Sequence, residues 1–434
     1  MNNMKKINVI TLGCSKNTVD SEHLAAQLAD AGYEIVFDSD HTRSDVVVIN
    51  TCGFIGDAKK ESIDTILAAA AAKQQGLVGE LFVIGCLSER YADELRAELP
   101  EVDDFFGVKN WEQIVERLGA RHRRELETRR MLSTPSHYAY LKIAEGCDRM
   151  CGYCAIPLIR GRYVSRPIEE LVEEATALAE SGVRELIVIA QDTTCYGIDL
   201  YGRRALAELL ERLCRIDKIR RIRLHYAYPT DFTDELIDTM AREKKICRYI
   251  DLPFQHISDS QLAAMKRNHT SAEAYALVDR LRGRIPGIAL RTTLMVGYPG
   301  ESEADFEELM EFVSRVRFER LGVFAYCEEE GTYSARRLKD DVPEDVKQER
   351  LDRIMRLQER ISLESNAARI GATMPVMIDS HEGDYYIGRT EFDSPEVDGE
   401  VLVQAGGRRL RRGCIYDVRI TDAEDYDLYG SVIE

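Results

Sequence analysis

The amino-acid sequence predicts an α/β protein with three regions. These are an N-terminal parallel α/β domain, a central partial (β/α)6 barrel of the TIM type and a small antiparallel β-barrel at the C-terminal end. Apolar runs of strand length alternate with amphipathic segments of helix length as far as about residue 365, which is typical of parallel sheets with crossover helices. Beyond residue 371 the runs are short, alternating and interrupted by glycine, which indicates a small barrel. The expected limits are residues 4–120, a charged linker at 121–134, then 135–368 and 371–434.

Three β-branched runs in the first region predict buried parallel strands, at residues 7–12, 45–49 and 81–84. Amphipathic segments between them predict one helix from Ser21 to Tyr33, with Ser21 as its N-cap, and another over residues 61–74. The strands and helices alternate, so this region is expected to form one open sheet with right-handed crossovers.

A cysteine follows each of these three strands, namely Cys14, Cys52 and Cys86. The carboxyl ends of parallel strands lie along one edge of a sheet, so the three thiols are expected to converge. A glycine precedes Cys14 and Cys86 and allows close approach of the backbone. One alternative is three buried structural cysteines, a common fate of this residue. The more specific hypothesis is that the three cysteines bind an iron-sulfur cluster with one open iron.

A loop in the central region carries Cys147, Cys151 and Cys154 in the spacing CxxxCxxC. Three thiolates on one loop can hold a 4Fe-4S cluster and leave one iron open. A zinc knuckle would pair such a motif with a second Cys/His pair, and none follows. The eleven cysteines are odd in number and no secretory signal precedes them, so reduced thiols are expected rather than disulfides.

The spacing of this loop resembles the signature of the radical S-adenosylmethionine enzymes. The resemblance implies that the open iron binds S-adenosylmethionine and that Tyr153 packs on its adenine. Six predicted strands surround this site, at residues 139–143, 185–190, 221–226, 249–253, 288–296 and 321–326. Barrel chemistry lies at the carboxyl ends of the strands, which makes Gln191, Asp192, Gly297 and Glu301 candidate cofactor-binding residues. Two further strand-end residues, His225 and His256, could equally be structural, and the glycine could simply shape a turn.

The formal charge of −18 disfavours a nucleic-acid substrate and favours a basic protein partner. Residues 372–434 alone contain six arginines, no lysine and fourteen acidic residues, a net charge of −8. Three basic clusters, at residues 121–130, 218–223 and 408–412, are expected to be solvated surface. No apolar run approaches the roughly 18 residues of a membrane span, so a cytoplasmic protein without membrane contact is expected.

Along its whole length the chain resembles the radical S-adenosylmethionine methylthiotransferases, which end in a small barrel of the TRAM type. Residues 11–22, 159–166, 190–197 and 395–399 are similar to the RimO branch of that family. The resemblance implies that the substrate is the basic small-subunit ribosomal protein numbered twelve, which receives a methylthio group on the β-carbon of one aspartate. The sister MiaB branch modifies adenosines of transfer RNA, and this activity is the alternative.

The same resemblance implies two 4Fe-4S clusters, S-adenosylmethionine and a reducing electron donor such as flavodoxin or ferredoxin. The cluster on the CxxxCxxC loop would generate a 5′-deoxyadenosyl radical that removes hydrogen from the aspartate. The cluster at Cys14, Cys52 and Cys86 would supply sulfur, and a second S-adenosylmethionine the methyl group. Cys195 and Cys327 depart from the family pattern and are interpreted as bystanders. A non-catalytic iron-sulfur carrier or an RNA-binding module is a third hypothesis. The CxxxCxxC loop on a barrel argues against it, because a carrier needs no cavity of cofactor size.

Overall fold

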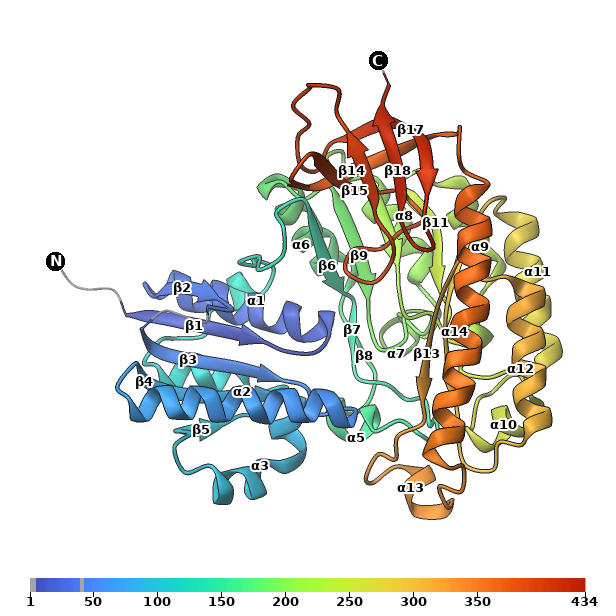
Figure 1. Cartoon of the computed structure of the whole chain (residues 1–434). Coiled ribbons are helices and arrows are strands. Elements are labelled where there is room, and N and C mark those ends of the chain that lie inside the picture. Colours follow the sequence, from blue (N-terminus) through green and yellow to red (C-terminus); the bar gives the residue numbers. More distant parts are fainter. Residues whose placement is uncertain (1–4, 40–42, 434) are drawn as a thin grey trace. The chain divides into compact units, whose positions relative to one another are not determined.

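The computed structural model describes residues 5–39 and 43–433, which form two compact units (Figure 1). The first unit comprises the described part of Met1–Thr134 together with Tyr140–Arg149 and Cys154–Leu178. The second comprises Pro135–Ala139, Met150–Tyr153 and the described part of Ala179–Glu434. Residues 4 and 434, the outer limits of the first and last predicted regions, lie outside the described residues.

The first unit is built on a five-stranded parallel sheet in the order β2-β1-β3-β4-β5. The three predicted strands are confirmed as β1, β3 and β4, and they are neighbours in the sheet. The strands are β1 (Lys6–Thr11), β2 (Glu34–Phe37), β3 (Ser44–Thr51), β4 (Val78–Gly85) and β5 (Asp104–Phe105). The helices of the sheet region are α1 (Ser15–Asp30), α2 (Gly56–Gln74), α3 (Cys86–Glu98) and α4 (Trp111–Arg117), and a 3-10 helix, η1 (Arg124–Leu126), follows.

Helices cover both faces of this sheet (Figure 1). Val46 and Val48 of β3 share one apolar cluster with Leu24 of α1. The alternate residues Val47 and Ile49 belong to a second cluster, on the side of α2. Both faces of each central strand are therefore buried, which is why these strands are almost continuously apolar.

Helix α1 begins earlier than the sequence pattern predicts. It starts at Ser15 with Cys14 as the N-cap residue, so Ser21 lies inside the helix and the predicted N-cap is wrong. The first turn is held by contacts that helix propensity does not reveal. The amide of Asn17 donates to the carbonyl oxygens of Leu12 and Thr51, over 2.8 and 3.1 Å. These bonds tie the helix start to the ends of β1 and β3.

Four elements lie between residues 143 and 182 of the chain. The strands β7 (Ala144–Glu145) and β8 (Val164–Ser165) form an antiparallel pair. Helix α5 (Ile156–Arg160) follows the cysteine loop directly, and α6 (Ile168–Ser181) comes after β8.

A six-stranded sheet has the order β13-β12-β11-β10-β9-β6, which corresponds to the six predicted strands. It belongs to the second unit except for the last three residues of β6, which the first unit includes. The pairings from β9 to β13 are parallel. The strands are β6 (Tyr138–Lys142), β9 (Glu185–Ile189), β10 (Arg221–Leu224), β11 (Ile246–Asp251), β12 (Ala289–Val296) and β13 (Arg320–Ala325). The helical segments after β9 are α7 (Ile198–Tyr201), α8 (Leu206–Cys214), η2 (Pro229–Asp231), α9 (Asp234–Arg242), α10 (Asp259–Ala264), α11 (Ser271–Arg284), α12 (Glu303–Val316), α13 (Tyr333–Arg337) and α14 (Glu344–Ala367).

The chain ends in a closed five-stranded barrel, in the order β14-β15-β16-β18-β17. Its strands are β14 (Thr373–Glu382), β15 (Tyr385–Arg389), β16 (Val401–Gln404), β17 (Ile415–Ala423) and β18 (Leu428–Val432). The predicted barrel is confirmed, and one pair of neighbours, β16 and β18, is parallel rather than antiparallel. A closed ring with an odd number of strands cannot alternate direction throughout, so one parallel pair is a geometric necessity.

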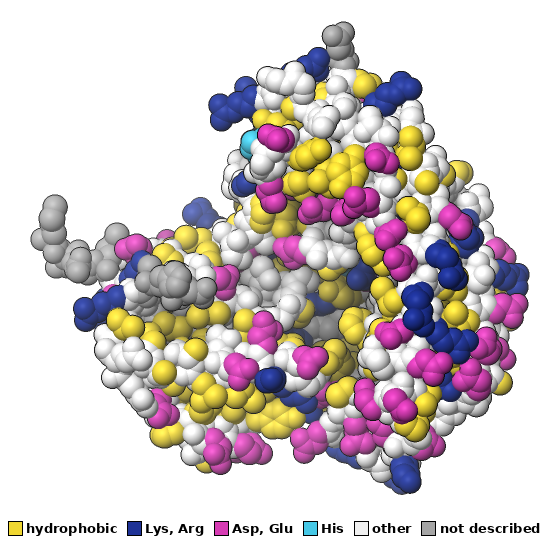
Figure 2. All heavy atoms as spheres, viewed as in Figure 1, with side chains coloured by type: hydrophobic (Ala, Val, Ile, Leu, Met, Phe, Trp, Pro, Cys, Tyr) yellow, Lys and Arg dark blue, Asp and Glu magenta, His cyan; other side chains and the backbone are white. Residues whose placement is uncertain are grey.

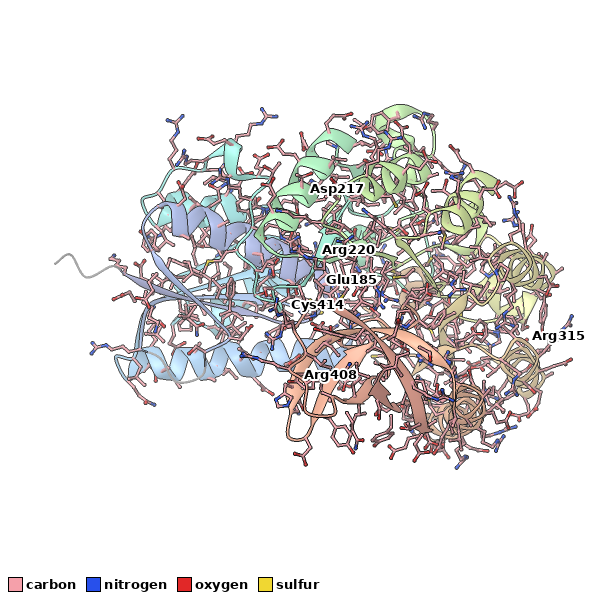
Figure 3. All side chains as sticks on the ribbon, turned by 90° about the horizontal axis from the view of Figure 1, so that it is seen from above. Glu185, Asp217, Arg220, Arg315, Arg408 and Cys414 are labelled. Carbon is pink, nitrogen blue, oxygen red and sulfur yellow. The ribbon has the colours of Figure 1, made fainter. Side chains whose placement is uncertain are left out.

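Parts of two predicted basic surfaces are buried. The side chain of Arg130, in the first cluster, is 0% exposed and pairs with Glu22 and Glu174, so it is not solvated surface. Arg221 and Arg223 of β10 are 5% and 0% exposed, so the prediction of a solvated face is wrong for them. The Nε of Arg223 donates to a carboxylate oxygen of Glu185 over 3.0 Å. The other oxygen of Glu185, labelled in Figure 3, accepts from Arg389 of the barrel, also over 3.0 Å. A buried charge needs an opposite charge as a partner. The sequence pattern of one segment does not reveal a partner that lies elsewhere in the chain. Arg408, in the third basic cluster, is exposed as predicted.

Candidate functional site

Cys14, Cys52 and Cys86 follow the neighbouring strands β1, β3 and β4, and the structure brings them together. A Cβ placed on Gly13 would lie 2.7 Å from the Cβ of Cys52. A Cβ on Gly53 would lie 2.4 Å from the carbonyl oxygen of Cys86. Each segment is therefore packed against the next at a distance that only glycine allows.

Two of these cysteines stand at helix N-termini, a feature that the sequence analysis missed. Cys14 precedes α1, and Cys86 is the first residue of α3. The positive end of a helix dipole stabilises a thiolate. Burial raises the pKa of the Cys86 thiol to about 11, against the opposing effect of the Arg160 guanidinium, and burial also raises the pKa of Cys52. Thiols held protonated in this way release protons when a metal binds.

The three sulfurs form a donor set that fits an iron-sulfur cluster. Thiolate is the ligand that iron in such clusters requires, and three ligands leave one of four irons open. The glycines at positions 13 and 53 leave space where side chains would otherwise fill the cradle. Arg160 faces this set. It lies within residues 159–166, a segment similar to the RimO branch, but the sequence analysis assigned no role to this arginine.

The CxxxCxxC loop is divided between the two units, with Cys147 and Cys154 in the first and Cys151 in the second. In the first unit, the N–H of Cys147 donates to the carbonyl of Gly161 over 3.0 Å. In the second, the guanidinium of Arg267 donates to the sulfur of Cys151 over 3.6 Å.

Arg267 is buried and stacks over the ring of Tyr228 at 4.2 Å. Its interactions with Tyr153, Cys151 and Tyr228 raise its pKa even though burial opposes the charge. Sequence reasoning missed this residue because only the fold brings it to the cysteine loop.

Tyr153, the predicted adenine neighbour, lies among aromatic residues of the second unit. It packs with Met265, Tyr298 and Tyr326, and its hydroxyl accepts from Arg267 over 3.4 Å. Since Tyr298 and Tyr326 follow β12 and β13, this tyrosine lies at the carboxyl-end edge of the sheet.

The other predicted cofactor residues lie at the same edge. Gln191 and Asp192 follow β9, whereas Gly297 and Glu301 follow β12. Asp192 is buried, and one of its oxygens accepts from the N–H and the hydroxyl of Thr194, over 2.9 and 2.6 Å. The carboxylate of Glu301 accepts from the N–H of Gly297. These contacts fix the two turns that would line a cofactor site.

The two strand-end histidines have partners within the fold. The Nε2 of His225 lies 2.9 Å from the hydroxyl of Ser394, and the ring stacks on Tyr249. The Nδ1 of His256 accepts from the N–H of Ser258 over 3.0 Å. Both contacts agree with the structural alternative for these histidines.

The two cysteines outside the family pattern lie in different surroundings. Cys195 donates to Asp192 over 3.2 Å, whereas Cys327 is exposed.

Comparison with protein families gives three matches that together span most of the chain. Residues 6–107 match the uncharacterized protein family UPF0004, residues 141–313 match the radical SAM superfamily, and residues 370–433 match the TRAM domain. The superfamily match includes the CxxxCxxC loop, and the first match includes Cys14, Cys52 and Cys86.

Curated relatives match the chain from end to end. A protein of Bacteroides fragilis called ribosomal protein uS12 methylthiotransferase RimO is 54% identical over 429 residues, which are 99% of each chain. The chain belongs to the RimO family. Relatives of the same name from Porphyromonas gingivalis and Flavobacterium johnsoniae are 52% and 53% identical, over 99% and 98% of this chain and 99% and 97% of theirs. RimO relatives at this identity do not favour the transfer-RNA alternative.

Two solved structures show a similar fold. The radical S-adenosylmethionine methyltransferase TsrM from Kitasatospora setae has a TM-score of 0.54 at 14% identity, over 74% of this chain and 75% of its own. The cobalamin-dependent enzyme OxsB has a TM-score of 0.52 at 11% identity, over 82% and 56%. Within the described residues, none of the helices has the length and apolarity to cross a membrane.

Proposed function

We propose that this RimO-family enzyme methylthiolates the β-carbon of an aspartate in ribosomal protein uS12. The observation that carries the proposal is full-length identity above one half to relatives of that name, in a chain whose fold gathers Cys14, Cys52 and Cys86. We assign a role to each predicted region. Residues 4–120 would hold the first cluster, 121–134 form the linker, 135–368 carry the radical chemistry and 371–434 form the TRAM barrel.

Two 4Fe-4S clusters are proposed, one on Cys14, Cys52 and Cys86 and the other on Cys147, Cys151 and Cys154. When bound, the clusters and S-adenosylmethionine supply a radical that can break an unactivated C–H bond, a sulfur atom and a methyl group. The pKa of the Cys86 thiol, raised to about 11 by burial, keeps this ligand protonated until metal binds. Arg267 holds a positive charge against the sulfur of Cys151.

Tyr153, Gln191, Asp192, Gly297 and Glu301 are proposed to bind S-adenosylmethionine. The support is their common location at the carboxyl-end edge of the second sheet and the rigidity of their turns. Fixed side chains and backbone groups hold a cofactor in one orientation without loss of further conformational freedom. A reductant such as flavodoxin or ferredoxin is proposed as the electron source.

The charge of the chain supports a basic protein substrate. Acidic side chains are spread over the face in Figure 2, with basic ones among them. In the barrel, Asp379 and Asp393 are bound to Arg389 and Arg320, so part of the acidic excess is internal. Exposed acidic residues remain, including Glu382, Asp384 and Glu400. An acidic surface attracts a basic partner and repels phosphate.

Mass spectrometry of a reconstituted reaction tests the proposal. The enzyme is incubated with uS12 and, in parallel, with bulk transfer RNA, together with S-adenosylmethionine, sulfide and a reductant. We expect one methylthio group in place of one hydrogen on the protein and no gain on the RNA. A peptide with the target aspartate replaced by alanine is the matched control and should stay unmodified. Modification of the RNA alone would overturn the proposal.

A further inference from the structure

Helix α5, which follows the CxxxCxxC loop, packs against the cysteine set of the first region. Ala155 and Ile159 share an apolar cluster with Cys86 and Val108. The last residue of this helix is Arg160, only 1% exposed. A guanidinium is therefore buried beside the three thiols by a segment that begins at Cys154.

The guanidinium of Arg160 is fixed by several partners in the first unit. One nitrogen donates to the side-chain oxygen of Asn17 over 2.5 Å. The other terminal nitrogen donates to Glu145 over 2.9 Å and to Asp20 over 3.3 Å. Lys142 contacts the same two carboxylates. Only the planar fork of arginine can satisfy partners in such different directions.

The remaining face of this guanidinium acts on the thiols. Its charge acts on both Cys86 and Cys14. The packing of α5 on Cys86 holds it there. Its network is balanced, because Lys142 and Arg160 offset Asp20 and Glu145. An iron-sulfur cluster on three thiolates carries a net negative charge, and the arginine is the cation that faces it. Hydrogen bonds and charges at the sulfurs set the potential of such a cluster.

We propose that Arg160 is a positioning residue for the cluster at Cys14, Cys52 and Cys86, which raises its reduction potential and helps retain its iron. The inference rests on the proposed function, because it requires that cluster. Helix α5 continues from Cys154. Arg160 therefore links the chain segment that carries Cys154 to the set of Cys14, Cys52 and Cys86. Arg160 is not a ligand of the iron, because its charge acts on the cluster through the three cysteine sulfurs.

The test uses the full chain with Cys147, Cys151 and Cys154 replaced by alanine, so that only the first cluster is measured. Iron content after anaerobic reconstitution should be about four per chain in this parent. A parent that binds no iron would mean that the proposed cluster is wrong, an outcome separate from the role of Arg160. The midpoint potential is then measured by electron paramagnetic resonance during a redox titration.

In this parent, Arg160→Met should lower the midpoint potential and speed iron loss to a chelator by about 10- to 100-fold. If this variant does not fold, the pair Arg160→Met with Glu145→Gln removes one charge of each sign and should show the same shift. The matched controls are Lys142→Met, which removes a cation from the same network, and Arg162→Met, an exposed arginine two residues away. Both should keep the parent potential.

Two results would overturn the inference. One is a folded Arg160 variant that keeps both the potential and the iron retention of the parent. The other is an equal shift in Lys142→Met, since that would show a general effect of buried charge rather than an effect specific to the Arg160 guanidinium.

Discussion

At the scale of single residues, the cysteine site depends on small residues next to its ligands. Gly13 has a φ of +91°, and its missing side chain leaves room for Cys52. Gly32, in the same unit, also has a φ of +91°, but a Cβ there would meet nothing within 4 Å. Substitution of these two glycines can therefore distinguish the cost of backbone strain from the cost of crowding Cys52.

Gly13→Ala should destabilise the fold and reduce the iron bound at the first cluster. A left-handed φ costs an alanine about 1–2 kcal/mol, and the contact at 2.7 Å adds displacement of Cys52. Gly32→Ala should show only the strain cost and normal iron content. Urea unfolding and iron analysis measure the two effects. Equal iron content in the two variants would contradict the role given to Gly13.

The residue scale also shows what the sequence could and could not predict. Convergence of Cys14, Cys52 and Cys86 followed from strand order, because each comes after a recognisable strand. Arg160 and Arg267 could not be assigned in this way. Their partners, such as Asn17 and Cys151, lie more than a hundred residues away in the chain. No local pattern encodes that proximity.

At the scale of elements, the start of β9 is joined to the C-terminal barrel by an ion pair. Glu185, the first residue of β9, binds Arg223 of β10 and Arg389 of β15. Burial opposes ionisation, yet the guanidinium groups of Arg389 and Arg223 hold the pKa of Glu185 at about 2. The strands were predictable from their apolar pattern, but this pairing of charges was not.

Glu185→Gln should lower the free energy of unfolding by about 3–5 kcal/mol, because it leaves buried guanidinium charge unpaired. The pKa of Glu185 is lower in the folded chain than its usual 4.5. Its contribution is therefore complete above about pH 4.5 and is lost as pH falls toward 2. Urea unfolding from pH 7 to pH 3 should show a shallower acid dependence in the variant.

Asp217→Asn is the matched control, since Asp217 is exposed on the loop after α8 (Figure 3). It should change neither the stability nor the pH dependence. A Glu185→Gln variant as stable as the parent at pH 7 would show that the barrel is not held through this residue.

At the scale of the whole molecule, the sequence predicted a parallel α/β sheet, a (β/α)6 barrel and a terminal small barrel. Hydrophobic periodicity was sufficient for this because the parallel sheets bury nearly continuous apolar strands, whereas the C-terminal barrel buries alternate residues of its strands. The start of α1 was mispredicted because tertiary hydrogen bonds from Asn17, rather than propensity, define it. Predictions from local sequence patterns fail most readily around a functional site, where polar residues are buried.

Iron content of the whole chain is the quantity that tests the two proposed cysteine sets together. The reconstituted protein should hold about eight irons per chain. Replacement of Cys14, Cys52 and Cys86 by alanine should remove about half of them and abolish methylthiolation. Reductive cleavage of S-adenosylmethionine should persist, because the CxxxCxxC loop is intact. Replacement of Cys147, Cys151 and Cys154 should also halve the iron but abolish cleavage. Loss of cleavage in both variants would contradict the assignment of radical generation to one set alone.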